Sequence, residues 1–258
     1  PFCFQSRNWR FNIMNLMEWR ILLDKLINDS DFAHKSYFAG GCVRDFLLNP
    51  DSSITSDIDI CVEIFEGGIA LAKYLQNYLP ESDIIIHQSF GTASLRYKNY
   101  KLEFVATRKE KYYPGSRYPQ VQFGNLLDDV LRRDFTINAL LMSITTGEIL
   151  DLSCKGLSDL KQGIIRTVQD PDKSFSEDPL RMLRALQFAL RFNFQIEDKT
   201  LKAMQKNTPA LKILSKRAIQ EELNKIPESK RQEAIAFIDK MNWKPYLKHK
   251  SETQNEQC

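Results

Sequence analysis

Seven residues, Ser56-Asp57-Ile58-Asp59-Ile60-Cys61-Val62, alternate in a pattern typical of a β-strand. With a period of two, the apolar residues share one face, whereas Asp57 and Asp59 share the other face with Cys61. Two carboxylates on one face are costly unless a cation lies between them. Carboxylate oxygens suit Mg²⁺, and residues two apart on a strand, ~6.6 Å along its axis, can converge on a metal pair. We therefore predict Asp57 and Asp59 as ligands of two Mg²⁺ ions, although Asp-x-Asp is also common in loops, turns and helix caps.

The stretch just upstream, Gly40-Gly41-Cys42-Val43-Arg44-Asp45, predicts an anion site. Residues 36–39 are typical of a strand and residues 43–48 of a helix, so the glycine pair lies at a strand–helix junction. Glycine lets backbone N–H groups approach a phosphate, and the dipole of the helix favours negative charge. Arg44 adds a fork-shaped cation that suits phosphate. The alternative is a plain strand–turn–helix with Arg44 in solvent.

Composition indicates a globular chain of ordinary polarity. The 258 residues are 43% hydrophobic and 27% charged, which suits one large domain or two small ones. Five scattered cysteines without a Cys-x-x-Cys motif favour a reducing, cytoplasmic location over a zinc site or a disulfide framework. No apolar run reaches transmembrane length, so we expect no membrane partner. Residues 1–15 are set aside as an N-terminal extension without a signal-peptide core.

Charge is distributed unevenly along the chain. Residues 199–250 hold 13 Lys or Arg against 5 Asp or Glu, a net charge of +8, whereas residues 1–198 carry −3. A basic segment behind an acidic one is typical of a grip on nucleic acid. The alternative is a solvated, lysine-rich surface.

Helices and strands alternate over the first half of the chain. We predict helices over residues 16–27 and 69–79, and strands over residues 84–86, 92–97 and 102–107 with a hairpin turn at 97–101. In the last strand Glu103 shares a face with Lys101 and Thr107. Glu103 is thus either a third carboxylate beside Asp57 and Asp59 or a surface glutamate paired with a lysine.

Residues 109–126 are rich in charge, proline and glycine, and we predict a long loop that is either a lid or disordered. The string that follows, Asp128-Asp129-Val130-Leu131-Arg132-Arg133-Asp134-Phe135-Thr136-Ile137-Asn138-Ala139, holds two arginines and an aspartate that would suit phosphate and a ribose hydroxyl. Its alternative is a charged helix start capped by Asp134. Residues 147–159 predict a turn-rich connector and residues 164–168 a short closing strand.

A long helix is predicted to begin at Ser176 as its N-cap, with Pro179 in the first turn. Asp178, Arg181 and Arg184 then recur at a spacing of three, which usually indicates surface ion pairs. Everything beyond Arg191 is predicted to be helical, over residues 198–206, 215–226 and 228–241.

Four separate motifs resemble those of class II tRNA nucleotidyltransferases and bacterial poly(A) polymerases. They are Gly-Gly-x-Val-Arg-Asp at 40–45, Asp-x-Asp at 57–59, the Arg-Arg-Asp string at 128–139 and Glu-Asp-x-x-Arg at 177–181. The resemblance spans roughly residues 36–226, which correspond to the head and neck of that family.

The resemblance implies an α/β (α+β) nucleotidyltransferase head with a small mixed sheet at residues 16–152. An all-helical neck that binds the nucleotide base and RNA would follow at 153–250, with a tail at 251–258. It implies Asp57 and Asp59 as catalytic metal ligands. Glu103 is a candidate third catalytic carboxylate. Nucleotide would be bound by Gly41, Arg44, Arg133, Asp178, Arg181 and Arg184. Arg133 belongs to the motif that selects ribose, and Asp178 and Arg181 to the protein template that reads the Watson–Crick edge of C or A. A flexible loop at the position of residues 109–126 is thought to help the switch from adding C to adding A.

Two departures from the family pattern bear on specificity. An arginine often found three residues after Arg184 is replaced by Gln187. The neck motif Ser-x-Glu-Arg-Ile-x-x-Glu-Leu here has Arg217-Ala218 in place of Glu-Arg. The chain also ends just beyond the neck, so either it is a truncated form, or the basic stretch or a second subunit, as in a homodimer, supplies the grip on tRNA.

We therefore predict metal-dependent addition of nucleotides (CCA or part of it) from CTP and ATP to tRNA 3′ ends. The alternatives are an A-only-adding enzyme or a bacterial poly(A) polymerase, and, in another class, a degenerate RNA-binding protein without activity.

Overall fold

The computed structural model describes residues 14–54, 57–113 and 116–247, which form two compact units. Unit 1 comprises the described residues up to Ala106 together with Leu141–Leu150. Unit 2 comprises Thr107–Leu140 and the described residues from Asp151 onward. The sequence-based boundary at residue 152 differs from this division, because residues 107–140 pack with the second unit. Ser56, the tail at 251–258 and most of the N-terminal extension lie outside the described residues.

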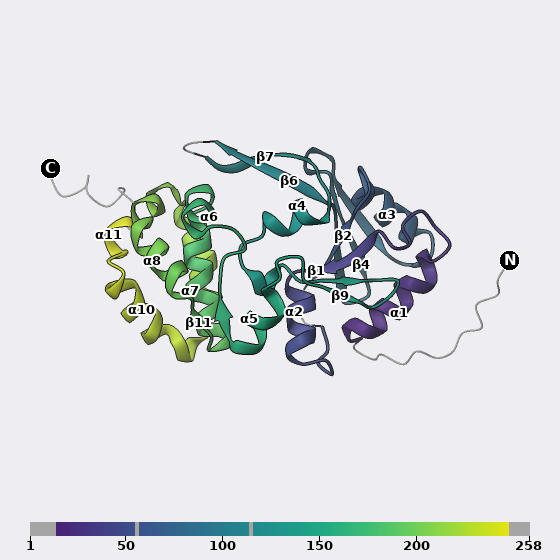
Figure 1. Cartoon of the computed structure of the whole chain (residues 1–258). Helices are drawn as coiled ribbons and strands as arrows, with labels where there is room; N and C mark the ends of the chain where they lie inside the picture. Colours follow the sequence, from purple (N-terminus) through teal and green to yellow (C-terminus); the bar gives the residue numbers. More distant parts are fainter. Residues whose placement is uncertain (1–13, 55–56, 114–115, 248–258) are drawn as a thin grey trace, which may run out of the picture. The chain divides into compact units, whose positions relative to one another are not determined.

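The core of unit 1 is a seven-stranded sheet, in which Figure 1 labels β1, β2, β4 and β9. The strand order is β3-β4-β5-β2-β1-β8-β9. Strands β2 and β5 pair in parallel, whereas every other neighbouring pair is antiparallel, so the mixed sheet predicted from the sequence is confirmed. The strands are β1 (Ser36–Ala39), β2 (Ile58–Val62), β3 (Asp83–His87), β4 (Thr92–Tyr97), β5 (Tyr100–Ala106), β8 (Leu141–Ser143) and β9 (Ile149–Leu150). The predicted limits of β1 and β4 match those observed.

Three helices complete unit 1, and the first has the predicted limits. They are α1 (Leu16–Ile27), α2 (Gly41–Leu48) and α3 (Gly67–Gln76), with a short 3₁₀ turn at Gln88–Phe90. Helix α1 begins with a capping box in which Asn15 and Glu18 satisfy each other's backbone N–H groups. Helix α3 packs closely on β5, because a Cβ added to Gly68 would lie 2.8 Å from the backbone of Val105. Only glycine permits that approach.

Unit 2 begins with a β-hairpin where the sequence predicted a loop. Strands β6 (Arg108–Tyr113) and β7 (Ser116–Phe123) pair antiparallel, so the loop prediction for residues 109–126 was wrong. Half-buried and exposed residues alternate along β6 as expected of a strand. The pattern escapes recognition because charged residues and tyrosines occupy both faces instead of aliphatic residues on one.

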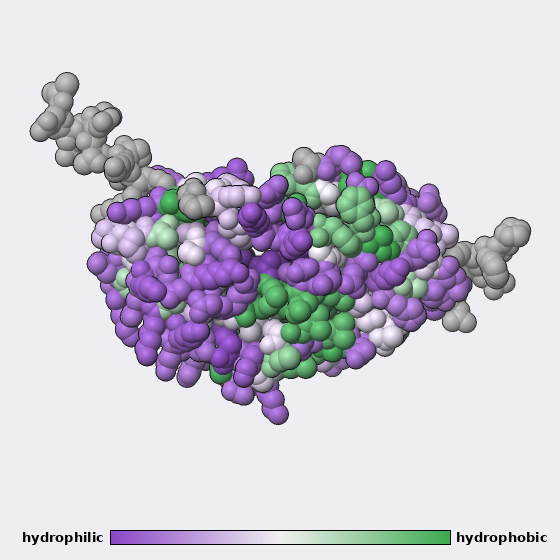
Figure 2. All heavy atoms as spheres, turned by 45° about the horizontal axis from the view of Figure 1, so that its top comes forward, coloured by the Kyte–Doolittle hydropathy of each residue, from purple (hydrophilic) through white to green (hydrophobic). Residues whose placement is uncertain are grey.

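The other elements of unit 2 are mostly helical. They are α4 (Leu126–Leu131), a 3₁₀ turn at Thr136–Asn138, α5 (Gly156–Gln162), β10 (Ile164–Ile165), α6 (Pro171–Glu177), α7 (Leu180–Phe192), β11 (Gln195–Ile196), α8 (Asp198–Lys206), a 3₁₀ segment at Thr208–Ile213, α9 (Lys216–Leu223), a 3₁₀ turn at Glu228–Lys230, α10 (Arg231–Lys240) and α11 (Lys244–Leu247). Helix α8 has the predicted limits, and the predicted connector at 147–159 contains β9 and the start of α5. The predominantly helical neck also holds one short parallel pair, β10–β11. Figure 2 shows hydrophilic residues covering most of this helical part, at the left of the view.

The long helix predicted from Ser176 is in fact two helices. Helix α6 ends at Glu177, Asp178 is extended (φ −140°, ψ 99°), and α7 begins after Pro179. The break follows from Pro179, because a residue that precedes proline avoids the helical conformation. Ser176 therefore lies in the last turn of α6, where its hydroxyl donates to the carbonyl of Lys173, and is not an N-cap. Among the described residues, no helix has both the length and the apolar character needed to span a bilayer.

Candidate active site

The alternation predicted for β2 places its carboxylates outward. Ile58 and Ile60 are completely buried in the sheet, whereas Asp59 is partly exposed. Asp57 directly precedes the strand and is exposed. Burial of the isoleucines therefore fixes the direction in which the two aspartates point.

Glu103 lies beside Asp59 on the neighbouring strand. The parallel register pairs Asp59 with Glu103 and Ile58 with Leu102. Lys101 links the carboxylates, since its Nζ lies 3.0 Å from Asp57 Oδ2 and also donates to Glu103 Oε1. These hydrogen bonds, first that to Glu103 and then that to Asp57, raise the pKa of Lys101. Glu103 is therefore both an acidic neighbour of the aspartates and the partner of a lysine.

These residues fit a divalent cation that shares its coordination with a nucleotide. No group of three or more His, Cys, Asp or Glu side chains in the described part of the chain is arranged to hold a metal ion. Mg²⁺, however, usually takes only one or two protein carboxylates and completes its shell with phosphate oxygens and water. Asp57 and Asp59 supply that number of ligands, with Glu103 next to them in the register.

The glycine turn lies against the same part of β2. Gly40 has a φ of 71°, which favours glycine, and α2 begins at the next residue. Cys42, in the first turn, donates from its Sγ to the backbone oxygen of Asp59 at 3.9 Å. Burial, followed by the negative charge of Asp59, raises the pKa of the Cys42 thiol to about 12. The predicted phosphate site and the predicted metal ligands are therefore neighbours within unit 1.

Arg44 is buried next to this turn. Its side chain is 4% exposed, and its Nη2 lies 2.7 Å from Asp45 Oδ1. A Cβ on Gly41 would lie 3.5 Å from the same Nη2, so the guanidinium is close to the start of the helix. The alternative with Arg44 in solvent was wrong.

A completely buried aspartate organises the arginine pair in unit 2. Asp129 Oδ1 lies 2.6 Å from Arg132 Nη2, and Asp129 Oδ2 lies 2.7 Å from Arg133 Nη2. Burial by itself would raise the pKa of Asp129, but the guanidiniums of Arg133 and Arg132 more than offset that effect and lower it. Asp129 was not among the predicted site residues, although its spacing of three and four from the arginines is the spacing of helical ion pairs.

Asp134 is not a helix cap but the partner of Arg184. Both Nε and Nη2 of Arg184 lie 2.7 Å from Asp134 Oδ2, while Asp134 Oδ1 accepts from Asn138 at 3.1 Å. Burial opposes ionisation of Asp134, but Arg184 outweighs it and lowers its pKa. Buried Glu222 of α9 lies 4.0 Å from Arg184 Nη1, so three segments of unit 2 meet at this guanidinium.

Asp178 lies in the break between α6 and α7, and a residue of the hairpin contacts it. Its Oδ1 accepts from the backbone N–H of Leu180 at 3.1 Å and from Arg117 Nε at 3.0 Å. Arg117 Nη2 lies 3.4 Å from the other carboxylate oxygen. Sequence reasoning missed Arg117, because its strand was not recognised and its partner is distant in the chain.

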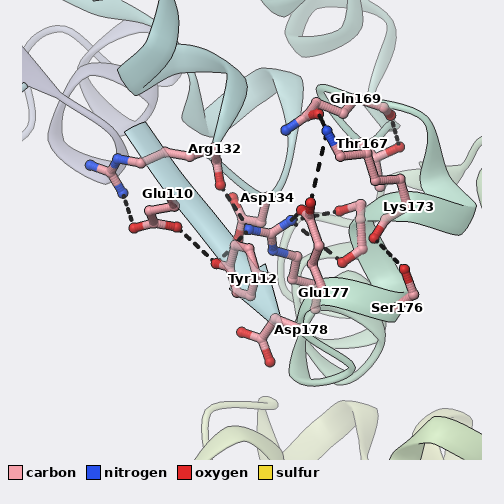
Figure 3. Close-up of polar contacts among 12 residues, drawn as sticks. Glu110, Tyr112, Arg132, Asp134, Thr167, Gln169, Lys173, Ser176, Glu177 and Asp178 are labelled. Atoms are coloured by element: carbon pink, nitrogen blue, oxygen red, sulfur yellow. Dashed lines mark hydrogen bonds and ion pairs between the residues drawn. The ribbon is translucent and has the colours of Figure 1, made fainter. Parts of the chain in front are cut away.

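Arg181 is an internal anchor of unit 2, beside the contacts of Glu110 with Tyr112 and Arg132 that Figure 3 shows. The residue is 5% exposed, and its guanidinium donates to the carbonyl of Arg132 at 2.8 Å and to Ser174 Oγ at 2.9 Å. Tyr112 of β6 lies 3.4 Å away through its hydroxyl, and Glu110 connects Tyr112 to Arg132. Surface ion pairing between Asp178 and Arg181, which their spacing indicated, is not what the structure shows.

The two departures from the family pattern have different surroundings. Gln187 is 1% exposed, and its Nε2 has no hydrogen-bond partner. Arg217 is exposed on α9 and pairs with Glu221 at 2.6 Å. Gln187 therefore lies in the interior of unit 2, whereas Arg217 lies on its surface.

The structure thus distributes the predicted residues over both units. Unit 1 holds Gly41, Arg44, Asp57, Asp59 and Glu103. Unit 2 holds Arg133, Asp178, Arg181 and Arg184, with Asp129, Asp134 and Arg117 as their partners.

Comparison with known families defines the class of protein. Residues 36–166 match the family described as "Poly A polymerase head domain". Residues 193–235 match "Probable RNA and SrmB- binding site of polymerase A". The chain belongs to this family of nucleotidyltransferases, which comprises the class II enzymes that its motifs resemble.

Particular relatives narrow the comparison. The chain is 38% identical over 214 residues to the CCA-adding enzyme of Lactobacillus helveticus, which covers 81% of this chain and 50% of that enzyme. It is 40% identical over 175 residues to the A-adding tRNA nucleotidyltransferase of Aquifex aeolicus, covering 66% of this chain and 20% of that protein. The chain thus spans half or less of the length of these curated relatives.

A solved structure gives the same result for the fold. A tRNA nucleotidyltransferase complexed with a primer tRNA and an incoming ATP analog superposes with a TM-score of 0.70 at 33% identity. The match covers 83% of this chain and 59% of that one. The predicted nucleotidyltransferase fold is confirmed.

Proposed function

We propose that this chain carries the catalytic part of a metal-dependent nucleotidyltransferase that adds nucleotides (CCA or part of it) to tRNA 3′ ends from CTP and ATP. The observation that carries the proposal is the meeting of the glycine turn of α2 with Asp59, next to Asp57 and Glu103. A phosphate site beside paired carboxylates suits a nucleoside triphosphate with its metal ions. The relatives that add CCA or A to tRNA support the same activity.

In this mechanism each candidate residue has a separate task. Asp57 and Asp59 hold two Mg²⁺ ions, and Glu103 adds negative charge beside them. When bound, such a metal pair lowers the cost of activating the 3′-hydroxyl and neutralises the triphosphate. Gly41 offers backbone N–H groups and Arg44 a guanidinium to the phosphates. Arg133, oriented by Asp129, binds the ribose and phosphate of the incoming nucleotide.

Base selection is assigned to the residues at the start of α7. Asp178 offers carboxylate acceptors, and Arg184, whose side chain is 31% exposed, offers donors beside it in the sequence. Arg181 fixes the backbone on which both are carried, because its own guanidinium already binds Ser174 and Arg132. Arg117 places the hairpin on Asp178, which is the contact that a loop controlling the switch from C to A would need.

Two alternatives remain within and outside this class. An A-only enzyme or poly(A) polymerase is favoured by the similarity to an A-adding enzyme and by Gln187 in place of arginine. A degenerate RNA-binding protein would need no metal site, whereas Asp57 and Asp59 are both present and outward-facing.

Three RNAs separate these functions: a tRNA that ends before CCA, a tRNA that ends in CC and an unrelated RNA. Each is incubated with the chain, with Mg²⁺ and with the nucleoside triphosphates singly and in pairs. CCA addition requires CTP first and then ATP, an A-only enzyme extends only a primer that ends in CC, and a poly(A) polymerase adds many A residues to unrelated RNA. RNA binding without any incorporation would exclude catalysis and contradict the proposal.

The organisation of the protein follows from the same proposal. Residues 16–152 correspond to the head and 153–250 to the neck that binds base and RNA, with the hairpin segment packed on the neck side. The cytoplasmic location and the homodimer stay predictions. Sedimentation of the purified chain would test the second.

A further inference from the structure

The two faces of the β6–β7 hairpin have different chemistry. Burial alternates along β6 and along β7 as far as Gln120. The inner face carries Glu110, Tyr112 and Arg117, whose contacts with Arg132, Arg181 and Asp178 hold the hairpin to the rest of unit 2. The outer face is exposed and carries Lys109, Lys111, Tyr113, Ser116, Tyr118, Gln120 and Gln122.

The outer face is positively charged without local compensation. Glu110 is the one acidic residue among the described residues of the two strands, and its side chain is on the inner face, 6% exposed. Within the described ranges, neither Lys109 nor Lys111 forms an ion pair with a carboxylate. Lysines of the basic segment differ, since Lys199 pairs with Asp170 at 3.0 Å and Lys206 with Asp172 at 2.7 Å.

Two tyrosines on the outer face are exposed to solvent. Tyr118 is 77% exposed and Tyr113 48% exposed. The hydroxyl of Tyr113 donates to Gln120 Oε1 at 2.9 Å across the strands. Lys111 Nζ lies 5.4 Å from the centre of the Tyr113 ring, and the guanidinium of Arg117 lies 5.6 Å from that of Tyr118. A cation therefore lies over each ring, while about half of Tyr113 and most of Tyr118 remain exposed to solvent.

We infer that this outer face binds a segment of single-stranded RNA, with bases stacked on Tyr113 and Tyr118 and phosphates on Lys109 and Lys111. Aromatic rings interleaved with cations on an open sheet surface are the elements with which proteins hold unpaired nucleotides. A duplex would expose its backbone but no base surface for the tyrosines to stack on. The inference rests on the proposed function only in taking RNA as the acceptor, and binding itself requires no catalysis.

The test measures binding of a short, fluorescent single-stranded RNA of mixed sequence to the full chain by anisotropy, without nucleotide. Base stacking is worth about 1–3 kcal/mol per base, so the loss of two stacking rings in Tyr113→Ala with Tyr118→Ala should weaken binding roughly 30-fold or more, whereas Phe at both positions should preserve it. Lys109→Gln with Lys111→Gln should make the slope of log affinity against log salt less negative by about 1.4.

A matched pair controls for total charge. Lys199→Gln with Lys206→Gln removes the same two charges from lysines that already have carboxylate partners, and should leave the slope unchanged. Equal weakening by this pair and the hairpin pair would overturn the inference, as would unchanged RNA affinity in both hairpin variants. All of these side chains face solvent, so thermal unfolding should be the same in each variant.

Nucleotide incorporation into saturating tRNA separates this inference from the proposed function. If the wild-type chain adds no nucleotide but the hairpin variants lose RNA affinity as expected, the proposed function fails and the inference stands. If the wild type adds nucleotides while the hairpin variants bind RNA as tightly as it does, the inference fails and the proposed function stands.

Discussion

Asp57 and Asp129 are both aspartates of candidate nucleotide-handling sites, yet the side chain of Asp57 is 52% exposed and that of Asp129 is completely buried. Around Asp57, the side chains of Glu103 and Lys101 are 43% and 36% exposed. Around Asp129, those of Arg132 and Arg133 are 17% and 13% exposed, and each is already bonded to it.

The difference reflects two ways of arranging charge for binding. An exposed carboxylate keeps its hydration until a cation replaces the water, so it costs little in the free protein and stays accessible to metal. A buried carboxylate must be paired, and its partners are then fixed in direction before any ligand arrives. The carboxylates of β2 therefore stay accessible from solvent, whereas the arginines of unit 2 are held in fixed directions.

The largest expected effect comes from removing the exposed aspartates of the β2 site. Asp57→Ala or Asp59→Ala should reduce nucleotide addition roughly 10⁴-fold or more, because metal ions stabilise the transition state by several kcal/mol. RNA affinity and thermal stability should remain close to wild type, since the removed side chains face solvent. The rate of incorporation into tRNA lacking CCA checks this, and full turnover in both variants would refute the metal assignment.

Asp129→Asn tests the role of the buried carboxylate. The isosteric change leaves Arg132 and Arg133 without their shared counter-charge and should lower the free energy of unfolding by about 3–5 kcal/mol, measured by urea denaturation. The pKa of Asp129 is lowered on folding, so its contribution is present above the unfolded pKa of about 3.9 and is lost as pH falls through the folded value.

Wild-type stability should therefore decline below about pH 4 more steeply than that of the Asn variant. Equal stability of the two proteins at neutral pH would mean that the arginines do not need Asp129. Asp57→Asn is the matched control, and its effect on unfolding should be below about 1 kcal/mol.

Asp178→Ala should act on selection more than on rate. Removal of its acceptors should reduce discrimination among the four nucleoside triphosphates about 10-fold while addition continues, because hydrogen bonds to a charged group contribute about 1.5–3 kcal/mol. Competition between labelled triphosphates during a single addition measures this ratio. Asp172→Ala, which removes an exposed carboxylate from α6, is the control. A slower variant with unchanged discrimination would contradict the template role.

The smallest effect concerns Lys101, which occupies the space between carboxylates that a cation would share. Lys101→Gln removes two exposed ion pairs, each worth at most about 1 kcal/mol, and should lower the Mg²⁺ concentration needed for half-maximal activity about 2- to 5-fold. Arg96→Gln, which removes a cation from an exposed position on β4, is the control for net charge. A higher Mg²⁺ requirement would show that Lys101 helps to assemble the site.

Much of unit 1 could be predicted because its signals are local. The period of two around Asp57, the apolar spacing of residues 16–27 and the glycine pair at 40–41 each determine a structure within a short stretch of the chain. Their predicted outcomes, an outward carboxylate pair, helix α1 and a strand–turn–helix, agree with the structure.

Unit 2 was harder to predict because its decisive contacts join distant segments. Nothing near Arg117 in the sequence indicates that it binds Asp178, and nothing near Arg181 indicates that it is buried. The ion pairs of Asp129 could have been predicted, since its spacing to Arg132 and Arg133 is helical. Its burial could not, because it depends on packing between distant segments. Pro179 is a local signal for a break between two helices, but it was interpreted as a first-turn residue of one long helix from Ser176.

Residues 107–140 interrupt unit 1 in the sequence. The sheet of unit 1 therefore cannot be completed until these residues have been synthesised. When Ala106 leaves the ribosome, the chain holds β1 to β5 and every candidate residue of unit 1, but β1 still lacks its second neighbour, β8. That edge of the sheet stays unpaired, and hence open to other strands, until the hairpin and α4 have been made and Leu141–Leu150 returns. A nascent chain stalled within residues 107–140 would therefore expose a sheet edge that the finished protein covers.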